Sequence, residues 1–268
     1  MSKIYIKNND PIGKDYYLLE LEAPDIIEQA LPGRFLNLKL SSDNNYDPLL
    51  RRPLSIHDIN PTTNSIYLLY RIVGRGTQIL STYTTGHTLD ILGPLGTGFS
   101  TNKSKENILV IGGGMGIAPL YYLCKKLSEN NKLTIVLGTN NMRNLEYFSD
   151  IFKELEQEIY LTTIDGSMGF KGNVVELCNK KINVSEYDYI YTCGPEPMLK
   201  PVQDMAIQNE IDGEVSMEER MGCGIGLCLS CVCDTKTGNQ RVCKEGPVLP
   251  INTVDFNHNN TGCGCSEN

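Results

Sequence analysis

The chain has 268 residues, which is longer than one typical domain, so two or three domains are expected. Hydrophobic residues make up 40% and charged residues 21%, a composition that excludes a disordered chain and allows real hydrophobic cores. The formal net charge is −8 and no Lys/Arg run exceeds two residues, which argues against a nucleic-acid-binding protein.

The amino terminus has no apolar signal core and the chain has no run of 18 apolar residues, so we expect a cytoplasmic protein that does not span a membrane.

The first hundred residues consist of short β-prone runs separated by turns. Asp-Pro, Pro-Gly, Asn-Pro and glycine-rich turns separate the runs, and this pattern predicts a small antiparallel barrel. The runs are residues 4–6, 16–21, 35–40, 55–59, 66–73 and 89–92.

The pattern changes at Asn107, where strand-like and helical runs begin to alternate. A buried-strand run is followed by a glycine-rich turn at 112–116 and by a helical period over 117–127. Such alternation predicts a parallel sheet covered by helices on both faces. Later strands are expected at 133–137, 159–163 and 187–192, and later helices over 145–155, near 174–178 and from Glu196.

The last segment, from about residue 213, is rich in Cys and Gly and too short to build an ordinary core, so a metal centre is expected to stabilise it. Seven of the ten cysteines follow residue 222, and in a reducing cytosol such a cluster favours metal or redox chemistry over disulfides. Cys223, Cys228, Cys231 and Cys243 have the Cys-x4-Cys-x2-Cys…Cys spacing of a plant-type [2Fe–2S] cluster.

Glycines between the first two of these cysteines would let the loop wrap closely around a cluster and direct its N–H groups at sulfur. Structural zinc is the alternative, although zinc usually prefers two Cys-x2-Cys pairs. Cys233 is an extra thiol beside the predicted ligands, and Cys263 and Cys265 are expected to be free thiols in the tail.

Two motifs in the barrel region predict a phosphate site. Arg52 opens a strand, and Gly76 and Thr77 begin a short helical stretch. A helix start with a Thr cap could hold a pyrophosphate, and Arg52 would neutralise its charge. Either motif alone is more typical of an ordinary turn, but both together before a nucleotide domain favour the phosphate site.

A second phosphate site is predicted where the glycine run joins a strand to a helix. The spacing is not the strict Gly-x-Gly-x-x-Gly, so two companion segments, 163–167 and 192–198, strengthen it, because both follow later strands. Cys193 either ends its strand as a small buried residue or, in the sharper hypothesis, lies beside a nicotinamide ring.

In this order the motifs resemble those of the ferredoxin–NADP reductase superfamily, and within it the family of electron transfer subunits of B-type dihydroorotate dehydrogenases. The resemblance covers nearly the whole chain. It is most specific in the segments Glu219-Arg220-Met221-Gly222 and Arg241-Val242-Cys243-Lys244-Glu245-Gly246-Pro247-Val248. Its other marks are residues 52–55, 69–71, 76–77, 93–99, the glycine run and Cys193-Gly194-Pro195.

The resemblance implies an FAD-binding β-barrel domain (residues 1–102), a Rossmann-like NAD-binding domain (103–212) and a small [2Fe–2S] domain (213–268). It implies cluster ligation by the four cysteines named above. It assigns Arg52, Pro53, Leu54, Ser55, Leu69, Tyr70, Arg71, Gly76 and Thr77 to flavin binding. The pattern at the strand ends adds Gly112, Gly113, Gly114, Gly116, Gly194 and Pro195 as cofactor-binding residues, with Cys193 as the expected catalytic residue.

Two positions depart from the family pattern. Leu54 stands where the wider superfamily often has a Tyr that stacks on the flavin. The loop at 138–143 has no Asp or Glu for a ribose hydroxyl and carries one Arg, so both NADH and NADPH remain open.

The cofactors have complementary electron chemistry, since a nicotinamide exchanges two electrons and a [2Fe–2S] centre carries one; a flavin can do both. With three His and no acid–base motif for an organic substrate, an outside partner is needed. The resemblance implies an FMN-containing dihydroorotate dehydrogenase catalytic subunit, in a heterotetramer of two of each chain that reduces NAD during pyrimidine synthesis. The alternatives are an NAD(P)H reductase subunit serving ferredoxin, a hydrogenase or sulfur metabolism, and a zinc-bearing non-enzymatic module.

Overall fold

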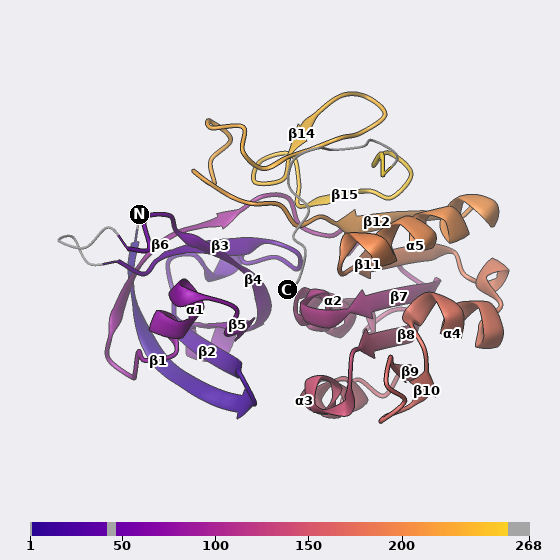
Figure 1. Ribbon diagram of the computed structural model, residues 1–268, viewed down its shortest axis with the longest axis horizontal. Coiled ribbons are helices and arrows are strands. Elements are labelled where there is room, and N and C mark those ends of the chain that lie inside the picture. Colours follow the sequence, from indigo (N-terminus) through magenta and orange to yellow (C-terminus); the bar gives the residue numbers. More distant parts are fainter. Residues whose placement is uncertain (1, 42–46, 257–268) are drawn as a thin grey trace.

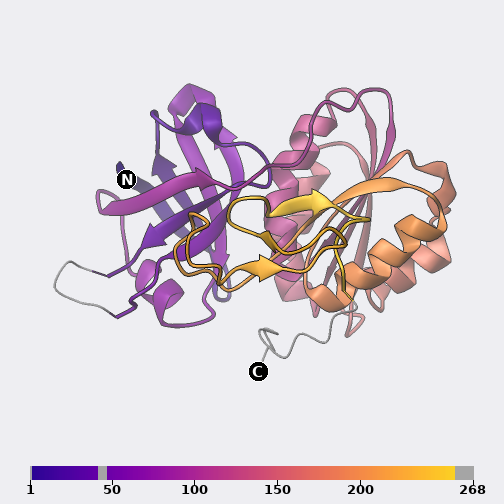
Figure 2. The same cartoon turned by 90° about the horizontal axis from the view of Figure 1, so that it is seen from above.

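The computed structural model describes residues 2–41 and 47–256. An antiparallel barrel and a parallel-sheet domain lie side by side, and the Cys-rich segment extends along one side of both (Figures 1 and 2). The predicted fold class is therefore confirmed. None of the helices in the described ranges is long and apolar enough to cross a membrane.

Six strands close the barrel in the order β1-β2-β5-β4-β3-β6, with every neighbouring pair antiparallel. Alternate side chains such as Leu19, Leu36 and Leu68 point inward and are fully buried, as the period of two predicts. The strands are β1 (Ser2–Gly13), β2 (Tyr16–Glu22), β3 (Phe35–Lys39), β4 (Arg52–Asn60), β5 (Ser65–Arg71) and β6 (Thr88–Leu95), with the helix α1 (Arg75–Leu80) before β6 and 3-10 turns η1 (Ile27–Gln29) and η2 (Pro61–Thr63).

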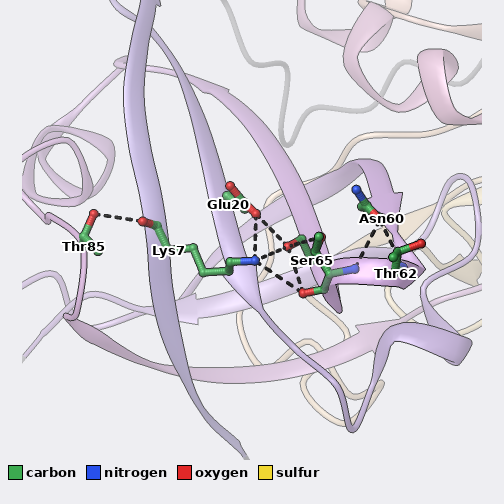
Figure 3. A network of polar contacts seen from close by, with 7 residues as sticks. Lys7, Glu20, Asn60, Thr62, Ser65 and Thr85 are labelled. Carbon is green, nitrogen blue, oxygen red and sulfur yellow. Dashed lines mark hydrogen bonds and ion pairs between the residues drawn. The ribbon is translucent and has the colours of Figure 1, made fainter.

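A polar network ties three strands together on the outside of the barrel (Figure 3). Lys7 Nζ on β1 lies 3.2 Å from Glu20 Oε1 on β2 and 2.9 Å from Ser65 Oγ on β5. The Ser65 hydroxyl donates a 2.6 Å hydrogen bond to Glu20. Because the network cross-links β1, β2 and β5, its role is structural.

The second domain is a seven-stranded sheet with the order β10-β9-β8-β7-β11-β12-β15, parallel except for β15. Helices α2 and α3 pack on one face with Ile108 and Val110, and α4 and α5 pack on the other with Leu109 and Ile111. The strands are β7 (Asn107–Gly113), β8 (Lys132–Thr139), β9 (Glu158–Thr163), β10 (Phe170–Lys171), β11 (Tyr189–Cys193), β12 (Asp212–Ser216) and β15 (Val248–Pro250). The helices are α2 (Ile117–Leu127), α3 (Met142–Lys153), α4 (Val174–Lys181) and α5 (Glu196–Gln208), with 3-10 turns η3 (Gly114–Gly116) and η4 (Val184–Glu186).

The Cys-rich segment is built into this sheet. The predicted boundary at residue 213 falls inside β12, which pairs with β11 along its whole length. After the cysteine loop and the hairpin β13 (Val232–Cys233) and β14 (Gln240–Arg241), the chain returns to pair β15 with β12. Val242, Leu249 and Val254 pack in the same hydrophobic core as α5. The segment is too short for a core of its own and is stabilised by packing against the sheet domain.

The barrel and the sheet domain meet where α2 packs on β4. His57 Nδ1 on β4 lies 2.7 Å from the carbonyl oxygen of Ala118, and its ring stacks on Tyr121. Beside it, Lys125 Nζ and Asp58 Oδ2 form a 2.8 Å ion pair. These contacts fix the orientation of α2, and of the glycine-rich turn before it, relative to the barrel.

Candidate active site

One cavity of about 600 Å³ lies between the three parts of the molecule. Its lining comes from the barrel strands β4 and β5, from the carboxyl ends of β7, β8 and β11, and from residues 216–221 before the cysteine loop. Of the residues predicted from the sequence, Arg52, Pro53, Leu54, Ser55, Leu69, Tyr70, Arg71, Thr77, Gly113, Gly114, Gly116, Gly194 and Pro195 line it. The structure thus brings segments that are far apart in sequence to one site.

The barrel motifs meet at the start of α1. A Cβ built on Gly76 would lie 2.6 Å from Arg52 Nε, so the missing side chain leaves room for the guanidinium. Arg52 Nη1 donates to the carbonyl oxygen of Leu50 at 2.7 Å, which holds the side chain over the helix start. Gly76 itself lies behind Arg52 and is not part of the cavity lining.

The hydroxyl of Thr77 is used within the turn. Its Oγ1 accepts the backbone N–H groups of Val73 and Gly74, at 3.0 and 3.3 Å, and donates to the Gly74 carbonyl oxygen. This caps α1 and shapes the turn that faces the cavity. Thr77 therefore contributes through the backbone it orders.

The glycine run has a different role at each position. A Cβ at Gly112 would meet Leu120 at 2.9 Å, so this residue lets α2 pack against the sheet and does not line the cavity. Gly114 has a φ of +55° and open space where a side chain would stand. Gly116 lies against the backbone of Cys193, since a Cβ there would be 2.5 Å from that carbonyl. The turn is thus open to a ligand at its tip and tightly packed at its base.

Cys193 ends β11 directly below the cavity, but its side chain is 1% exposed and is absent from the lining. Burial raises the pKa of its thiol, and the nearby carboxylate of Glu218 acts in the same direction. Gly194 and Pro195, the next two residues, form the wall. The structure therefore places Cys193 under the site and brings its neighbours to the surface.

Several lining residues were not identified from the sequence. Asn140, Asn144 and Asn173 surround the far end of the cavity, beyond the glycine-rich turn. Their position after β8 and before α4, at the carboxyl edge of the sheet, was the signal that could have found them. Met217 and Glu219 line the end toward the cysteine loop, and burial raises the pKa of the Glu219 carboxyl.

The cysteine loop directs backbone N–H groups at its sulfur atoms. Cys223 Sγ receives N–H groups from Ile225, Leu227 and Cys228, each at 3.4 Å. Cys243 Sγ receives the N–H of Gly226 at 3.1 Å. Positive φ values at Gly224 and Gly226, +75° and +80°, allow these directions. Donors aimed at sulfur in this way suit anionic thiolates, so the loop fits the predicted cluster.

The four predicted ligands form two contacting pairs, Cys223 with Cys228 and Cys231 with Cys243. Hydrogen bonds from Ser230 and Cys223 lower the pKa of Cys228 to about 6, whereas burial and the neighbouring Cys231 raise the pKa of Cys243 to about 12. Across the described residues, no three His, Cys, Asp or Glu side chains converge on a site for a single metal ion. Two pairs of thiols match the demand of a centre with two irons.

One further cysteine in the described part of the segment, Cys233, belongs to neither of these pairs. Cys233 lies on β13 and is buried with Val242 and Met217 in the shared core, and burial raises the pKa of its thiol to about 11. Cys263 and Cys265 lie outside the described residues.

Comparison with protein families finds two matching models. Residues 218–255 match the iron–sulfur cluster binding domain of dihydroorotate dehydrogenase B, and residues 110–204 match an oxidoreductase NAD-binding domain. These ranges contain the cysteine loop and the glycine-rich turn. Together with the reductase-like barrel, they support the FAD, NAD and iron–sulfur sites.

Among solved structures, a structure of the NADH-dependent reduced ferredoxin–NADP oxidoreductase superimposes with a TM-score of 0.81 at 29% identity, covering 96% of this chain and 91% of that one. A ferredoxin–NADP+ reductase from Neisseria gonorrhoeae has a TM-score of 0.63 at 14% identity over 77% of this chain and 90% of that one, which shows the shared fold.

Curated relatives cover almost the whole chain. The electron transfer subunit of dihydroorotate dehydrogenase B (NAD+) from Desulforamulus reducens is 39% identical over 89% of this chain and 92% of the relative. The subunit of the same name from Shouchella clausii is 37% identical over 94% and 97%. Identity at this level over at least 89% of both chains, with the cluster loop and the nucleotide turn in place, shows that this chain belongs to the dihydroorotate dehydrogenase B electron transfer subunit family, oxidoreductase subunits that move electrons between NAD(H), FAD and an iron–sulfur cluster.

Proposed function

We propose that the chain passes electrons from a partner catalytic subunit, which holds FMN and oxidises dihydroorotate to orotate, to NAD+. The observation that carries this proposal is that one cavity is bordered by the barrel, the glycine-rich turn and the residues before the cysteine loop. A flavin bound there would link two-electron chemistry with nicotinamide to one-electron chemistry with the cluster. The names of the relatives support dihydroorotate and NAD+ as the two ends of the path.

Each part of the cavity has a proposed role. Arg52 would hold the FAD pyrophosphate, while 53–55 and 69–71 would line the flavin. Gly113, Gly114 and Gly116 would approach the nicotinamide dinucleotide closely, with the backbone of 194–195 on the other side. The three asparagines at the far end are neutral hydrogen-bonding groups that suit ribose hydroxyls, which favours NAD(H).

The proposed cluster ligands are Cys223, Cys228, Cys231 and Cys243. Cys228 is exposed, and the loop around it presents three large apolar side chains to solvent, Ile225, Leu227 and Leu229, the last two 77% and 61% exposed. We propose that the FMN subunit docks on this apolar rim, because an electron must cross from one chain to the other where the cluster is nearest the surface. From the membership in this family we also propose a complex of two chains of each kind, located in the reducing cytoplasm.

To test this proposal, the native complex is purified, its second chain is identified, and NAD+ reduction driven by dihydroorotate is measured. We expect a dihydroorotate-oxidising FMN subunit and dihydroorotate-dependent NADH formation. Copurification of a ferredoxin-linked enzyme instead, without dihydroorotate activity, would favour the ferredoxin alternative, to which the 29% identical oxidoreductase structure points.

A docking variant sharpens this test. Leu227→Asp should dissociate the partner and abolish dihydroorotate-dependent NAD+ reduction, yet leave NADH-driven flavin reduction in the isolated chain. Ile207→Asp is the matched control, since Ile207 is also exposed, at 48%, but lies on α5 away from the loop. Equal loss of the partner in both variants would contradict the docking surface.

A further inference from the structure

We infer that Asn37 of the barrel is a positioning residue for electron transfer that donates a hydrogen bond from Nδ2 to the sulfur of the cluster and thereby raises its reduction potential. The inference deepens the proposed function and rests on the proposed ligand set. Asn37 is on β3, outside every motif that the sequence marked as functional.

The first observation is that this amide is buried without a partner. The Asn37 side chain is 1% exposed, and neither Nδ2 nor Oδ1 makes a hydrogen bond to any described residue. Its neighbour Arg51 contacts the Asn37 backbone carbonyl oxygen at 3.4 Å and pairs with Asp90. Burying an amide without hydrogen bonds is costly, so such a group in a barrel wall points to a partner that binds from outside the chain.

The second observation is where the amide points. A Cβ built on Gly224 would lie 2.5 Å from Asn37 Nδ2, so the amide N–H group faces the backbone next to Cys223. Gly224 has a φ of +75° and can approach the barrel so closely because it has no side chain. Leu95 Cδ1 would lie 3.4 Å from the same Cβ on Gly224, so an apolar side chain packs beside this contact.

The third observation connects Asn37 with the cavity. Asn37 is directly opposite Pro53 in the β3–β4 register, and paired residues of antiparallel strands project from the same face. Pro53 lines the proposed flavin site. Asn37 thus lies next to a residue of the cavity wall on β4 and next to Gly224 of the cysteine loop.

The chemistry follows from charge. Reduction adds one negative charge to a cluster, and an N–H group donated to its sulfur stabilises the reduced form more than the oxidised form. Loss of one such bond should shift the one-electron equilibrium about tenfold toward the oxidised cluster. A tenfold change is 59 mV in a one-electron potential.

The experiment is a potentiometric titration of the purified chain, following the electron paramagnetic resonance signal of the reduced cluster and the flavin absorbance separately. Asn37→Leu, of similar size and without donors, should lower the cluster potential by about 59 mV, while the flavin potential stays unchanged. Asn37→Asp should lower it further, because a carboxylate replaces the N–H group. Ser149→Ala, which removes another buried and unpartnered polar group far away on α3, is the control and should change neither potential.

The outcomes separate this inference from the proposed function. Full iron and FAD content with an unchanged cluster potential in both Asn37 variants would overturn the inference and leave the ligand set standing. A shift of the flavin potential alone would also overturn it, since the amide would then serve the flavin. Loss of iron from both variants with FAD retained would make Asn37 a structural support of the loop and not a tuning residue.

Discussion

Arg52 combines the two barrel motifs, because its guanidinium lies over the start of α1 where Gly76 leaves room. Arg52→Ala should remove a charge-assisted phosphate contact worth ~1.5–3 kcal/mol, so FAD affinity should fall by about one to two decades. FAD retained after dilution and gel filtration measures this. Arg75→Ala is the control, since Arg75 is in the same helix but 64% exposed and paired with Asp47. Equal FAD retention in both variants would show that Arg52 does not bind the flavin.

Cys193 tests whether a buried residue below the cavity affects chemistry above it. Cys193→Ala should slow hydride transfer from NADH to the flavin, by about 10- to 100-fold, because a small shift of the supporting wall misplaces the nicotinamide. Both prosthetic groups should stay bound. Stopped-flow flavin reduction is the measurement, with the buried Cys178 on α4 changed to Ala as control. A rate equal to that of the parent would assign Cys193 to packing.

At the scale of elements, the cysteine loop and the hairpin after it divide the thiols between two roles. Each ligand should be changed to Ser singly, and each change should abolish the visible cluster bands and electron delivery to cytochrome while NADH still reduces the flavin. The four ligands are Cys223, Cys228, Cys231 and Cys243. Cys233→Ser should keep its iron, because Cys233 falls outside the Cys-x4-Cys-x2-Cys spacing and belongs to neither thiol pair. The number of iron atoms per chain, measured for each variant, distinguishes the ligands from Cys233. If Cys233→Ser loses iron and Cys231→Ser keeps it, the ligand set is wrong by one residue.

At the scale of the whole molecule, His57 couples the two large domains through Ala118 and Tyr121. Burial lowers the pKa of His57, against smaller opposite effects of the Ala118 hydrogen bond and Asp58, while Lys125 adds to the lowering. At a pH between the two pKa values of His57, the unfolded chain therefore binds a proton at this side chain and the folded chain does not. The stabilisation is present above the unfolded pKa of about 6.5 and is lost as pH falls below it, by at most about 1.4 kcal/mol per pH unit.

His57→Phe should keep the ring stacking but remove this pH dependence, so the loss of stability between pH 7.5 and 5.5 should be smaller than in the parent. Urea unfolding at the two pH values measures it. His87→Phe, at an exposed position that also stacks on a Tyr, should behave like the parent. An unchanged pH slope in His57→Phe would show that another group sets the acid sensitivity.

Local patterns were enough for most of the fold. Short β-prone runs separated by turns predicted the barrel strands, and the change to alternating strands and helices at Asn107 predicted the sheet, because both patterns are properties of short segments. The cysteine spacing and the glycine-rich turn predicted what each segment would bind. The pairing of β12 with β15 could not be predicted, because β15 lies more than thirty residues later and the two strands meet only in the folded chain.

The sequence by itself therefore determined the barrel, the parallel-sheet domain and the cofactors of this protein. Tertiary structure alone decided how they face one another. Arg52 beside Gly76, Gly116 against Cys193, and Asn37 behind Gly224 are contacts in which a missing Cβ admits another segment. No local period records such approaches, since their energy depends on packing between residues distant in sequence. For the same reason Asn37, unremarkable within β3, became a candidate only when the fold left its amide buried and facing the cysteine loop.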